Sequence, residues 1–175
     1  MRIIVAYYSL TGYTASLAKA TAEALEGHQV TLLEIVPAKP YSYFSAGVRG
    51  VAQAMAGTII ELISPVPESA VYDALVIFSP TWGWMSSPPV RSFVARLAPG
   101  EGRTAVVGVT HAGGPIGSFD RLANLVRYRG YNVAEVLSVF CYSPAQIAAA
   151  AAKAAAALAG VGSAAGEGAA PGRVT

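Results

Sequence analysis

The chain has 175 residues, of which 54% are hydrophobic and 13% charged, so it is long enough for one domain with a sizeable core. Its 12 basic residues form no run and its net charge is only +2, which excludes a nucleic-acid surface of the usual basic kind. With 2 histidines and 1 cysteine, a typical structural zinc site and an intrachain disulfide are also excluded. We expect no secretory signal and no membrane span, and therefore a cytoplasmic protein.

Apolar runs that alternate with helix-like stretches predict five strands. The strands are Ile3–Tyr8, Val30–Ile35, Ala74–Phe78, Thr104–Val109 and Val133–Phe140. The first, third and fourth are almost continuously apolar, as is typical of strands that are buried on both faces of a parallel sheet.

Five helices are predicted between and after these strands. The helices are Ala15–Leu25, Tyr43–Ala56, Pro88–Leu97, Gly117–Arg129 and Pro144–Leu158. The strict alternation predicts a doubly wound α/β protein, with three layers (α/β/α), a five-stranded parallel sheet and right-handed crossovers. We expect one domain over residues 1–160 and, from its composition, a flexible tail over residues 161–175.

The first strand-to-helix junction, YYSLTGYT, is rich in hydroxyl side chains and contains a single glycine. Ligands of open parallel sheets bind beyond the carboxyl ends of the strands, where the N-terminus of the next helix attracts a phosphate. Any one hydroxyl is equally well explained as a helix cap, but the whole group favours a phosphate site held by neutral donors. The chain contains neither G-x-x-x-x-G-K-[ST] nor G-x-G-x-x-G. The predicted residues are Ser9, Leu10, Thr11, Gly12, Tyr13 and Thr14.

The pattern S-x-T-G-x-T in this junction resembles the phosphate-binding loop of the flavodoxin family, which binds the phosphate of FMN without counter-charges. The similarity extends over roughly residues 2–158. It implies the flavodoxin-like strand order 2-1-3-4-5 and FMN as the cofactor.

The stretch SPTWGWMSSPP predicts a loop after the third strand, with Pro88 and Pro89 in the first turn of the next helix. It resembles the second FMN loop of flavodoxins, in which an aromatic ring packs on the isoalloxazine. Trp82 matches that aromatic position better than Trp84, and one of the two indoles alternatively packs the loop onto the core. The resemblance also implies a peptide flip at Gly83 that follows the flavin redox state. The predicted cofactor-binding residues are Pro80, Thr81, Trp82, Gly83 and Trp84.

The fourth strand leads into THAGGPIGSFD, which matches the third FMN loop of flavodoxins in position and glycine content. Many flavodoxins place a tyrosine here over the second face of the flavin, and this loop has none. His111 could stack on the ring, lie near its N1 atom or cap the turn. The predicted cofactor-binding residues are Thr110, His111, Ala112, Gly113 and Gly114.

Several residues outside these loops are predicted to be structural. Asp73 precedes the third strand and suits a turn or edge role, while Cys141 follows the fifth strand and suits a buried thiol. Tyr41, Tyr43 and Phe44 are predicted to pack in the core or against another subunit.

The sequence has no nucleophile elbow, no paired loop carboxylates and no cluster of metal ligands, so a bound flavin would carry any chemistry. The first hypothesis is an FMN-binding electron-transfer protein that shuttles electrons between a reductase and an acceptor. The alternative is an NAD(P)H-dependent FMN oxidoreductase acting on quinones or similar acceptors, which the long connection 37–68 and the near-neutral charge favour. A third hypothesis is a binding module that has lost the flavin. The expected partners are a redox protein or a small-molecule acceptor, with either a monomer or a homodimer.

Overall fold

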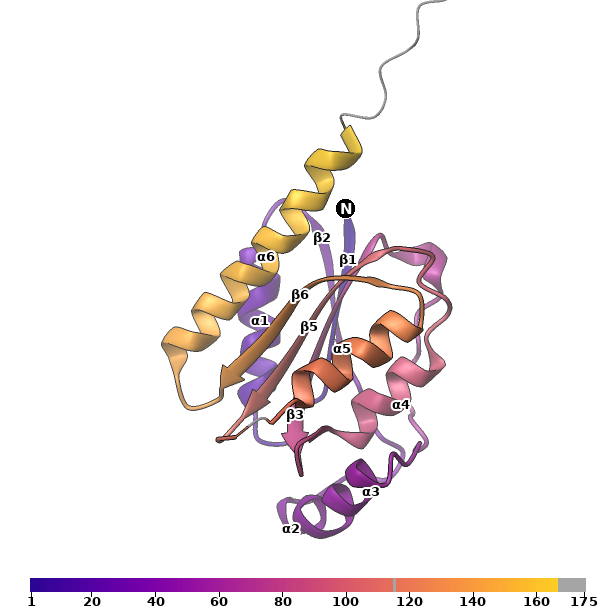
Figure 1. Ribbon diagram of the computed structural model, residues 1–175, viewed down its shortest axis with the longest axis vertical. Coiled ribbons are helices and arrows are strands. Elements are labelled where there is room, and N and C mark those ends of the chain that lie inside the picture. Colours follow the sequence, from indigo (N-terminus) through magenta and orange to yellow (C-terminus); the bar gives the residue numbers. More distant parts are fainter. Residues whose placement is uncertain (115, 167–175) are drawn as a thin grey trace, which may run out of the picture.

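The computed structural model describes residues 1–114 and 116–166, which form a twisted parallel sheet between two helical layers (Figure 1). The five parallel strands are β1 (Arg2–Tyr7), β2 (Gln29–Glu34), β3 (Ala74–Trp82), β5 (Thr104–His111) and β6 (Asn132–Phe140). Their order is β2-β1-β3-β5-β6, and the two-residue strand β4 (Met85–Ser86) pairs antiparallel with the end of β3. Counting the parallel strands alone, this order is the predicted 2-1-3-4-5.

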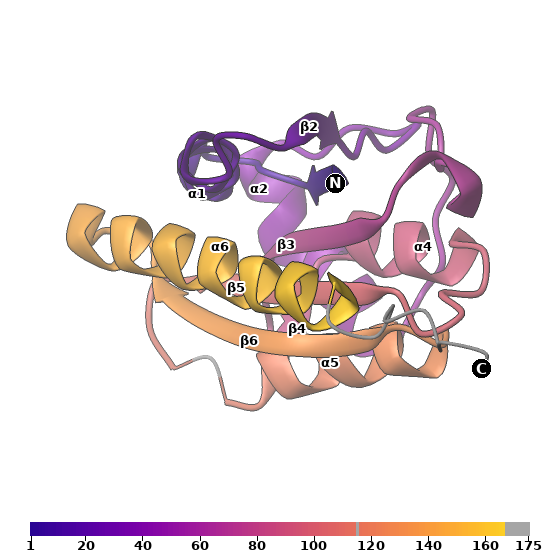
Figure 2. The ribbon, with the colours of Figure 1, turned by 90° about the horizontal axis from the view of Figure 1, so that it is seen from above.

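The helices cover the two faces of the sheet in pairs. Helices α1 (Tyr13–Ala24) and α6 (Pro144–Gly166) lie on one face, and α4 (Pro88–Arg96) and α5 (Ser118–Tyr128) lie on the other (Figures 1 and 2). Two buried clusters result, because alternate residues of each central strand point to opposite faces. The predicted three-layer α/β/α architecture is therefore confirmed.

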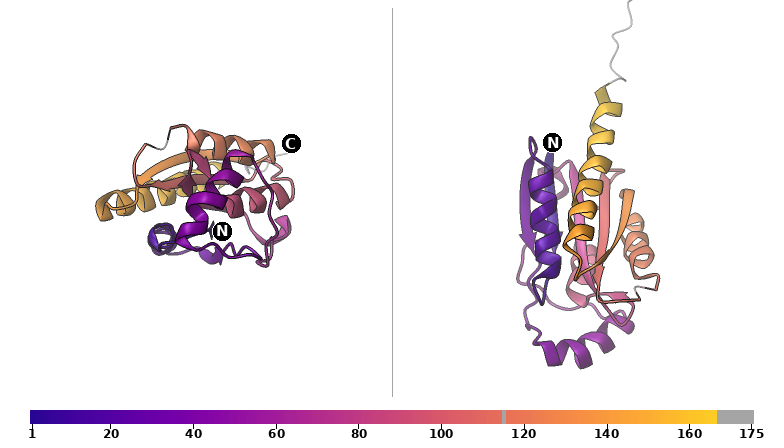
Figure 3. Two further views of the ribbon diagram at one scale, coloured as in Figure 1. Left: turned by 90° about the horizontal axis from the view of Figure 1, so that it is seen from below. Right: turned by 90° about the vertical axis from the view of Figure 1, so that its left-hand side faces the viewer.

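The long connection between β2 and β3 contains one continuous helical segment. It consists of α2 (Tyr43–Ser45), a π-helical turn (Ala46–Gly50) and α3 (Val51–Met55), so the predicted helix is present with a wider central turn. A short 3₁₀ turn, Ser69–Val71, follows later in the connection. The segment crosses the end of the molecule at which the strands have their carboxyl ends (Figures 1 and 3).

The three aromatic residues near the start of this segment have different environments. Tyr41 is buried, whereas Tyr43 is 82% exposed and Phe44 is 80% exposed. Tyr41 therefore has the predicted core position, whereas Tyr43 and Phe44 do not pack in the core of this chain, and their packing against another subunit stays a prediction. Helix α2 begins at Tyr43, and its single turn leaves both rings on the side away from the sheet core.

Strand β3 is longer than predicted. The density of proline and glycine after Phe78 predicted a loop, but the strand continues through Pro80 to Trp82. The reason is that β5 also continues, to His111, and pairs with this extension, with Pro80 opposite Thr110. The chain then reverses in a tight hairpin rather than entering an irregular loop.

Two helix boundaries are informative, one that agrees with the prediction and one that differs. Pro88 and Pro89 occupy the first positions of α4 as predicted, where the missing N–H groups break no hydrogen bond. Helix α6 continues beyond its predicted end at Leu158 as far as Gly166, and residues 167–175 of the predicted tail lie outside the described residues. Within the described part of the chain, no helix is long and apolar enough to cross a membrane.

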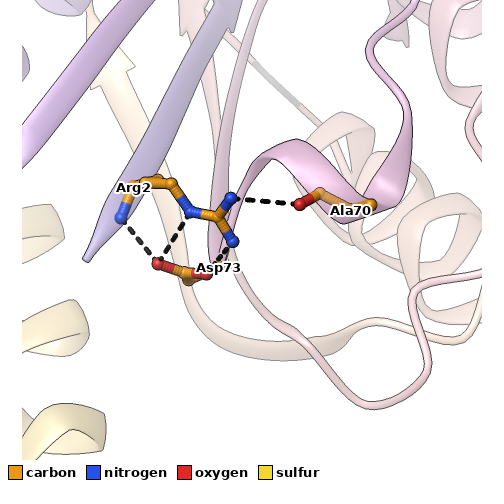
Figure 4. Close-up of polar contacts among 3 residues, drawn as sticks. All are labelled: Arg2, Ala70 and Asp73. Carbon is orange, nitrogen blue, oxygen red and sulfur yellow. Dashed lines mark hydrogen bonds and ion pairs between the residues drawn. The ribbon is translucent and has the colours of Figure 1, made fainter.

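The amino ends of β1 and β3 are joined by an ion pair (Figure 4). The guanidinium Nη2 of Arg2 lies 2.7 Å from Oδ1 of Asp73, and the backbone N–H of Arg2 donates to Oδ2 at 2.7 Å. Arg2 Nη1 also donates to the carbonyl oxygen of Ala70 at 3.1 Å. The hydrogen bonds from Arg2 lower the pKa of Asp73 to about 2. Asp73 has the predicted structural role, at the end of the sheet opposite the three loops.

Candidate functional site

The three loops singled out in the sequence meet at the carboxyl edge of the sheet, around a cavity of about 170 Å³. This first cavity is lined by Thr11, Tyr13, Thr14, Tyr43, Pro80, Thr81, Trp82, Thr110, His111, Ala112, Cys141 and Tyr142. Its walls therefore include residues at or just after the carboxyl ends of β1, β3, β5 and β6, which is the usual place for a ligand in a doubly wound sheet.

The N-terminus of α1 at this cavity has no side-chain cap. Gly12 is the N-cap residue with a φ of 91°, and the first turn contains no acidic residue. Among the described residues the N–H groups of Tyr13, Thr14 and Ala15 have no hydrogen-bond partner, whereas Ser16 N–H donates to the carbonyl of Gly12. The capping interpretation of the hydroxyls is thus wrong. Free N–H groups at the positive end of a helix dipole attract an anion.

The hydroxyl groups of this loop have different partners. Thr14 Oγ1 and Thr110 Oγ1 are 2.7 Å apart and buried, so this bond ties the first loop to the third. One hydrogen of this hydroxyl pair is not used in the bond and remains able to donate. Ser9 Oγ accepts from Gly12 N–H at 3.1 Å, which also leaves its own hydrogen free. Within the described residues, the exposed Thr11 hydroxyl makes no hydrogen bond.

The second loop is a β-hairpin whose two tryptophans lie in different places. Trp82 packs edge-on against Tyr8, with ring centroids 5.6 Å apart, and against Tyr41 at 5.0 Å. Its ring also lies directly over Gly50, so part of Trp82 fills the core and part lines the first cavity. Trp84 is 51% exposed and, with Gly83, lines a second cavity instead.

The third loop contributes its first residues to the cavity and leaves its glycines outside the lining. His111 Nε2 lies 3.1 Å from Ser138 Oγ, and its buried Nδ1 has no partner among the described residues. Burial lowers the pKa of His111, which favours the neutral form of the ring. Gly113 and Gly114, with φ of 152° and 55°, face open space and do not line the first cavity.

Three lining residues were missed by sequence reasoning: Tyr43, Cys141 and Tyr142. Tyr142 packs edge-on against Tyr13 at 5.1 Å and against Phe140 at 5.5 Å. The connection between β6 and α6 thus adds an aromatic ring to the cavity wall, which the third loop does not provide. The sequence offered one signal for Tyr142, because this residue comes directly after a predicted strand. The carboxyl ends of parallel strands lie at the same edge of the sheet, so such a residue is placed near the other loops. Cys141 is buried as predicted, and burial raises the pKa of its thiol.

The strand order and the loops at its carboxyl edge define a flavodoxin-like fold. Neither a protein-family model nor a curated protein matches the sequence. Several solved structures are similar. A protein from Bacteroides uniformis ATCC 8492 is 25% identical with a TM-score of 0.69, covering 85% of this chain and 96% of that one. A flavoprotein in complex with FMN from Lactobacillus acidophilus NCFM is 18% identical with a TM-score of 0.65, covering 78% and 92%.

A flavodoxin from the domain Archaea is 17% identical with a TM-score of 0.62, and the match covers 93% of this chain and 99% of that one. These similarities span nearly the whole length of the solved chains. They confirm the predicted resemblance to flavodoxins at the level of the fold.

Proposed function

We propose that the chain binds FMN with its phosphate at the first cavity, and that it acts as a flavodoxin-like electron-transfer protein. The observation that carries this proposal is the uncapped N-terminus of α1, which lies beside a group of neutral hydroxyls in that cavity. The FMN complex of the similar Lactobacillus acidophilus flavoprotein supports the same cofactor.

The donor groups fit a phosphate dianion. Three free N–H groups of the first helical turn and the hydroxyls of Ser9, Thr11 and Thr14 can donate to its oxygens. None of the described residues that line the first cavity has a charged side chain, and none is needed, because the helix dipole adds a favourable field. The other predicted residues of the three loops would hold the remainder of the nucleotide.

The size of the cavity bears on how much of the nucleotide it encloses. At about 170 Å³ it is smaller than the ~300–1,000 Å³ of typical ligand pockets, so it suits the phosphate end rather than a three-ring system. The ring system would then lie at the mouth, where Tyr142 and Trp82 offer flat surfaces. Bound FMN would supply reversible electron transfer, and the chain would orient it and limit its contact with water.

The alternative function, an NAD(P)H-dependent oxidoreductase acting on quinones or similar acceptors, is favoured by one observation. A second, largely apolar cavity of about 560 Å³ is lined by Gly83 and Trp84 of the hairpin, together with residues of other elements. A protein that exchanges electrons only with protein partners has no need of such a cavity. We place either activity in the cytoplasm, where the buried thiol of Cys141 would stay reduced.

A titration with FMN tests the proposal. Thr11→Ala removes a hydroxyl that has no partner among the described residues, so we expect FMN affinity to fall about tenfold with an unchanged melting temperature. Thr31→Ala is the matched control, because Thr31 is exposed on β2 and lies outside the cavity lining. Unchanged affinity in Thr11→Ala, or no binding of FMN by the unaltered protein, would contradict the proposal.

Kinetic assays of the FMN-loaded protein distinguish the two proposed functions. Rapid oxidation of NADPH in the presence of a quinone, without an added reductase, would establish the oxidoreductase. Reduction that requires an added flavodoxin reductase would establish the carrier.

A further inference from the structure

A third cavity lies beside the helical segment of the connection between β2 and β3, and none of its lining residues belongs to the three loops. Its volume is about 340 Å³, within the ~300–1,000 Å³ of typical small-molecule sites. It is lined by Ala38, Lys39, Tyr41, Arg49, Gln53, Ile60 and Glu61. It shares no lining residue with the first or the second cavity, so it is a separate place from the proposed nucleotide site.

Backbone hydrogen bonds fix the walls of this third cavity. The N–H of Ala38 donates to the carbonyl oxygen of Glu61 at 3.0 Å, which joins the first part of the connection to its return. The N–H of Ile60 donates to Ser92 Oγ of α4 at 2.8 Å. The segments that contribute these residues are therefore tied to each other and to the helical layer.

Arg49 lines the cavity from the π-helical turn Ala46–Gly50, and such rare turns are frequent at functional sites. Its Nη2 donates to the carbonyl oxygen of Pro40 at 3.2 Å, and its guanidinium lies over the Tyr41 ring, 4.7 Å from the centroid. Both partners are neutral, and the buried Nε has no hydrogen-bond partner among the described residues. Burying part of a cation without a carboxylate is costly, and an anion that binds here would offset that cost.

The other polar groups of the cavity are mainly unused donors. The Tyr41 hydroxyl donates to Gln53 Oε1 at 2.6 Å, so both hydrogens on the amide nitrogen of Gln53 remain available. The exposed ammonium of Lys39 forms no ion pair within the described part of the chain. Glu61 is acidic, but it is exposed and pairs with neither cation. This excess of donors suits a ligand whose polar atoms are acceptors.

We propose that the third cavity binds a small organic acid, whose carboxylate or phosphate group is held by Arg49 together with Lys39 and Gln53. The planar guanidinium fork matches the oxygens of such a group, and the ammonium adds a second positive charge. This site goes beyond the proposed function, because none of its lining residues is assigned to FMN.

Calorimetric titration of the FMN-loaded protein with succinate, inorganic phosphate and succinamide tests this inference. Saturating FMN occupies the proposed phosphate site in the first cavity, and succinamide has the carbon skeleton of succinate without its charges. We expect an anion to bind and succinamide not to bind. Tighter binding of succinate than of phosphate assigns a carboxylate ligand, and the reverse order assigns a phosphate ligand. The proposal is overturned if neither anion binds.

Two exposed charges in the lining should have effects of opposite sign. Lys39→Gln should weaken binding of the anion about threefold, and Glu61→Gln should strengthen it by a similar factor, because one attraction or one repulsion near the surface is removed. Lys19→Gln and Glu23→Gln are matched controls, since both residues are exposed outside the cavity and the net charge changes equally. Equal effects in the lining and the control variants would show a general response to charge, and would overturn the proposal.

Arg49→Gln should have the largest effect, a loss of about tenfold in affinity for the anion. It also removes the contacts with Pro40 and Tyr41, so its melting temperature is measured without ligand. If Arg49→Gln does not fold, Lys39→Gln still decides, because Lys39 forms no hydrogen bond or ion pair among the described residues. Unchanged affinity in a folded Arg49→Gln would give Arg49 a structural role alone and overturn the proposal.

The outcome is distinguishable from a failure of the proposed function. FMN affinity is measured in Lys39→Gln and Glu61→Gln and should not change, since neither residue lines the first cavity. If the unaltered protein does not bind FMN, the same titrations are made without it. Anion binding with opposite effects of the two variants would then leave this inference standing and remove the redox role.

Discussion

The loop after β1 and the hairpin after β3 lie at the same edge of the sheet, but they are stabilised in opposite ways. Residues 9–14 are polar and largely open, and they are ordered by hydroxyl bonds such as that between Thr14 and Thr110. The hairpin is apolar and closely packed, with Trp82 over Gly50 and with Gly83 against Val51. The first region keeps donors free for a ligand, whereas the second stores strain in a rigid turn, in which Trp84 has a φ of 61°. Two neighbouring regions at one edge of the sheet are therefore ordered by different physical means.

The largest expected change in stability comes from comparing Gly12 in the loop with Gly83 in the hairpin, both of which have positive φ. A Cβ at Gly83 would lie 2.7 Å from Cγ1 of Val51, but at Gly12 no described atom lies within 4 Å. Gly12→Ala should cost about 1–2 kcal/mol from conformation alone, and Gly83→Ala should cost about 1–3 kcal/mol more from overlap. Urea denaturation of both variants measures the difference. Equal losses would mean that the hairpin is no more tightly packed than the loop.

This result also affects how a peptide flip at Gly83 can be tested. An alanine there changes packing as well as backbone freedom, so altered flavin potentials in Gly83→Ala would not by themselves demonstrate a flip.

A somewhat smaller effect would sharpen the comparison at the base of the hairpin. In Gly50→Ala the new Cβ would lie 2.7 Å from Cζ3 of Trp82, so we expect a loss of about 1–3 kcal/mol and a displaced indole. Gly47→Ala, in the same π-helical turn, meets no described atom within 4 Å and should gain up to about 1 kcal/mol. Thermal unfolding followed by tryptophan fluorescence distinguishes the two. Equal changes in stability and fluorescence in both variants would contradict the close packing of Trp82 on Gly50.

The smallest expected effect concerns the ion pair between Arg2 and Asp73, which lies far from both regions and serves as a reference. The pKa of Asp73 is lowered to about 2, below its usual value of about 3.9, so the ion pair with Arg2 stabilises the fold fully above pH 4. That contribution is lost as the pH falls from about 4 to about 2. Asp73→Asn should therefore slightly lower the melting temperature at pH 7, and its curve should meet that of the unaltered protein near pH 2.

The exposed control Glu23→Gln should show no such convergence. A constant offset between Asp73→Asn and the unaltered protein down to pH 2 would contradict the lowered pKa. Both side chains of the pair are more than two-fifths exposed, at 48% and 42%, which keeps the effect small.

The architecture was predictable because strands that are buried on both faces consist mainly of apolar residues. Strands β1 and β3 lie inside the sheet and are mostly buried and apolar, whereas every residue of the edge strand β2 is exposed or half-buried. The first helix was placed to within two residues at its start, since the hydroxyl-rich junction precedes it. These features depend on local sequence or on burial alone.

The hairpin and the aromatic cover of the first cavity depend on partners that are distant in sequence. Strand β3 passes Pro80 only because β5 is long enough to pair with it. The contact between Tyr13 and Tyr142 joins two connections that are separated by most of the chain. No local pattern encodes either fact. The separation of Trp82 from Trp84 likewise follows from the turn between them, because Trp82 lines the first cavity and Trp84 lines the second.

The unequal placement of the two indoles has a practical consequence. Trp82 is packed among aromatic rings and Trp84 is half exposed, and the sequence contains no other tryptophan. The emission of the protein is thus the sum of a blue-shifted and a red-shifted component, and a water-soluble quencher reaches the second first. Each of the two neighbouring cavities carries its own built-in optical reporter, without any label.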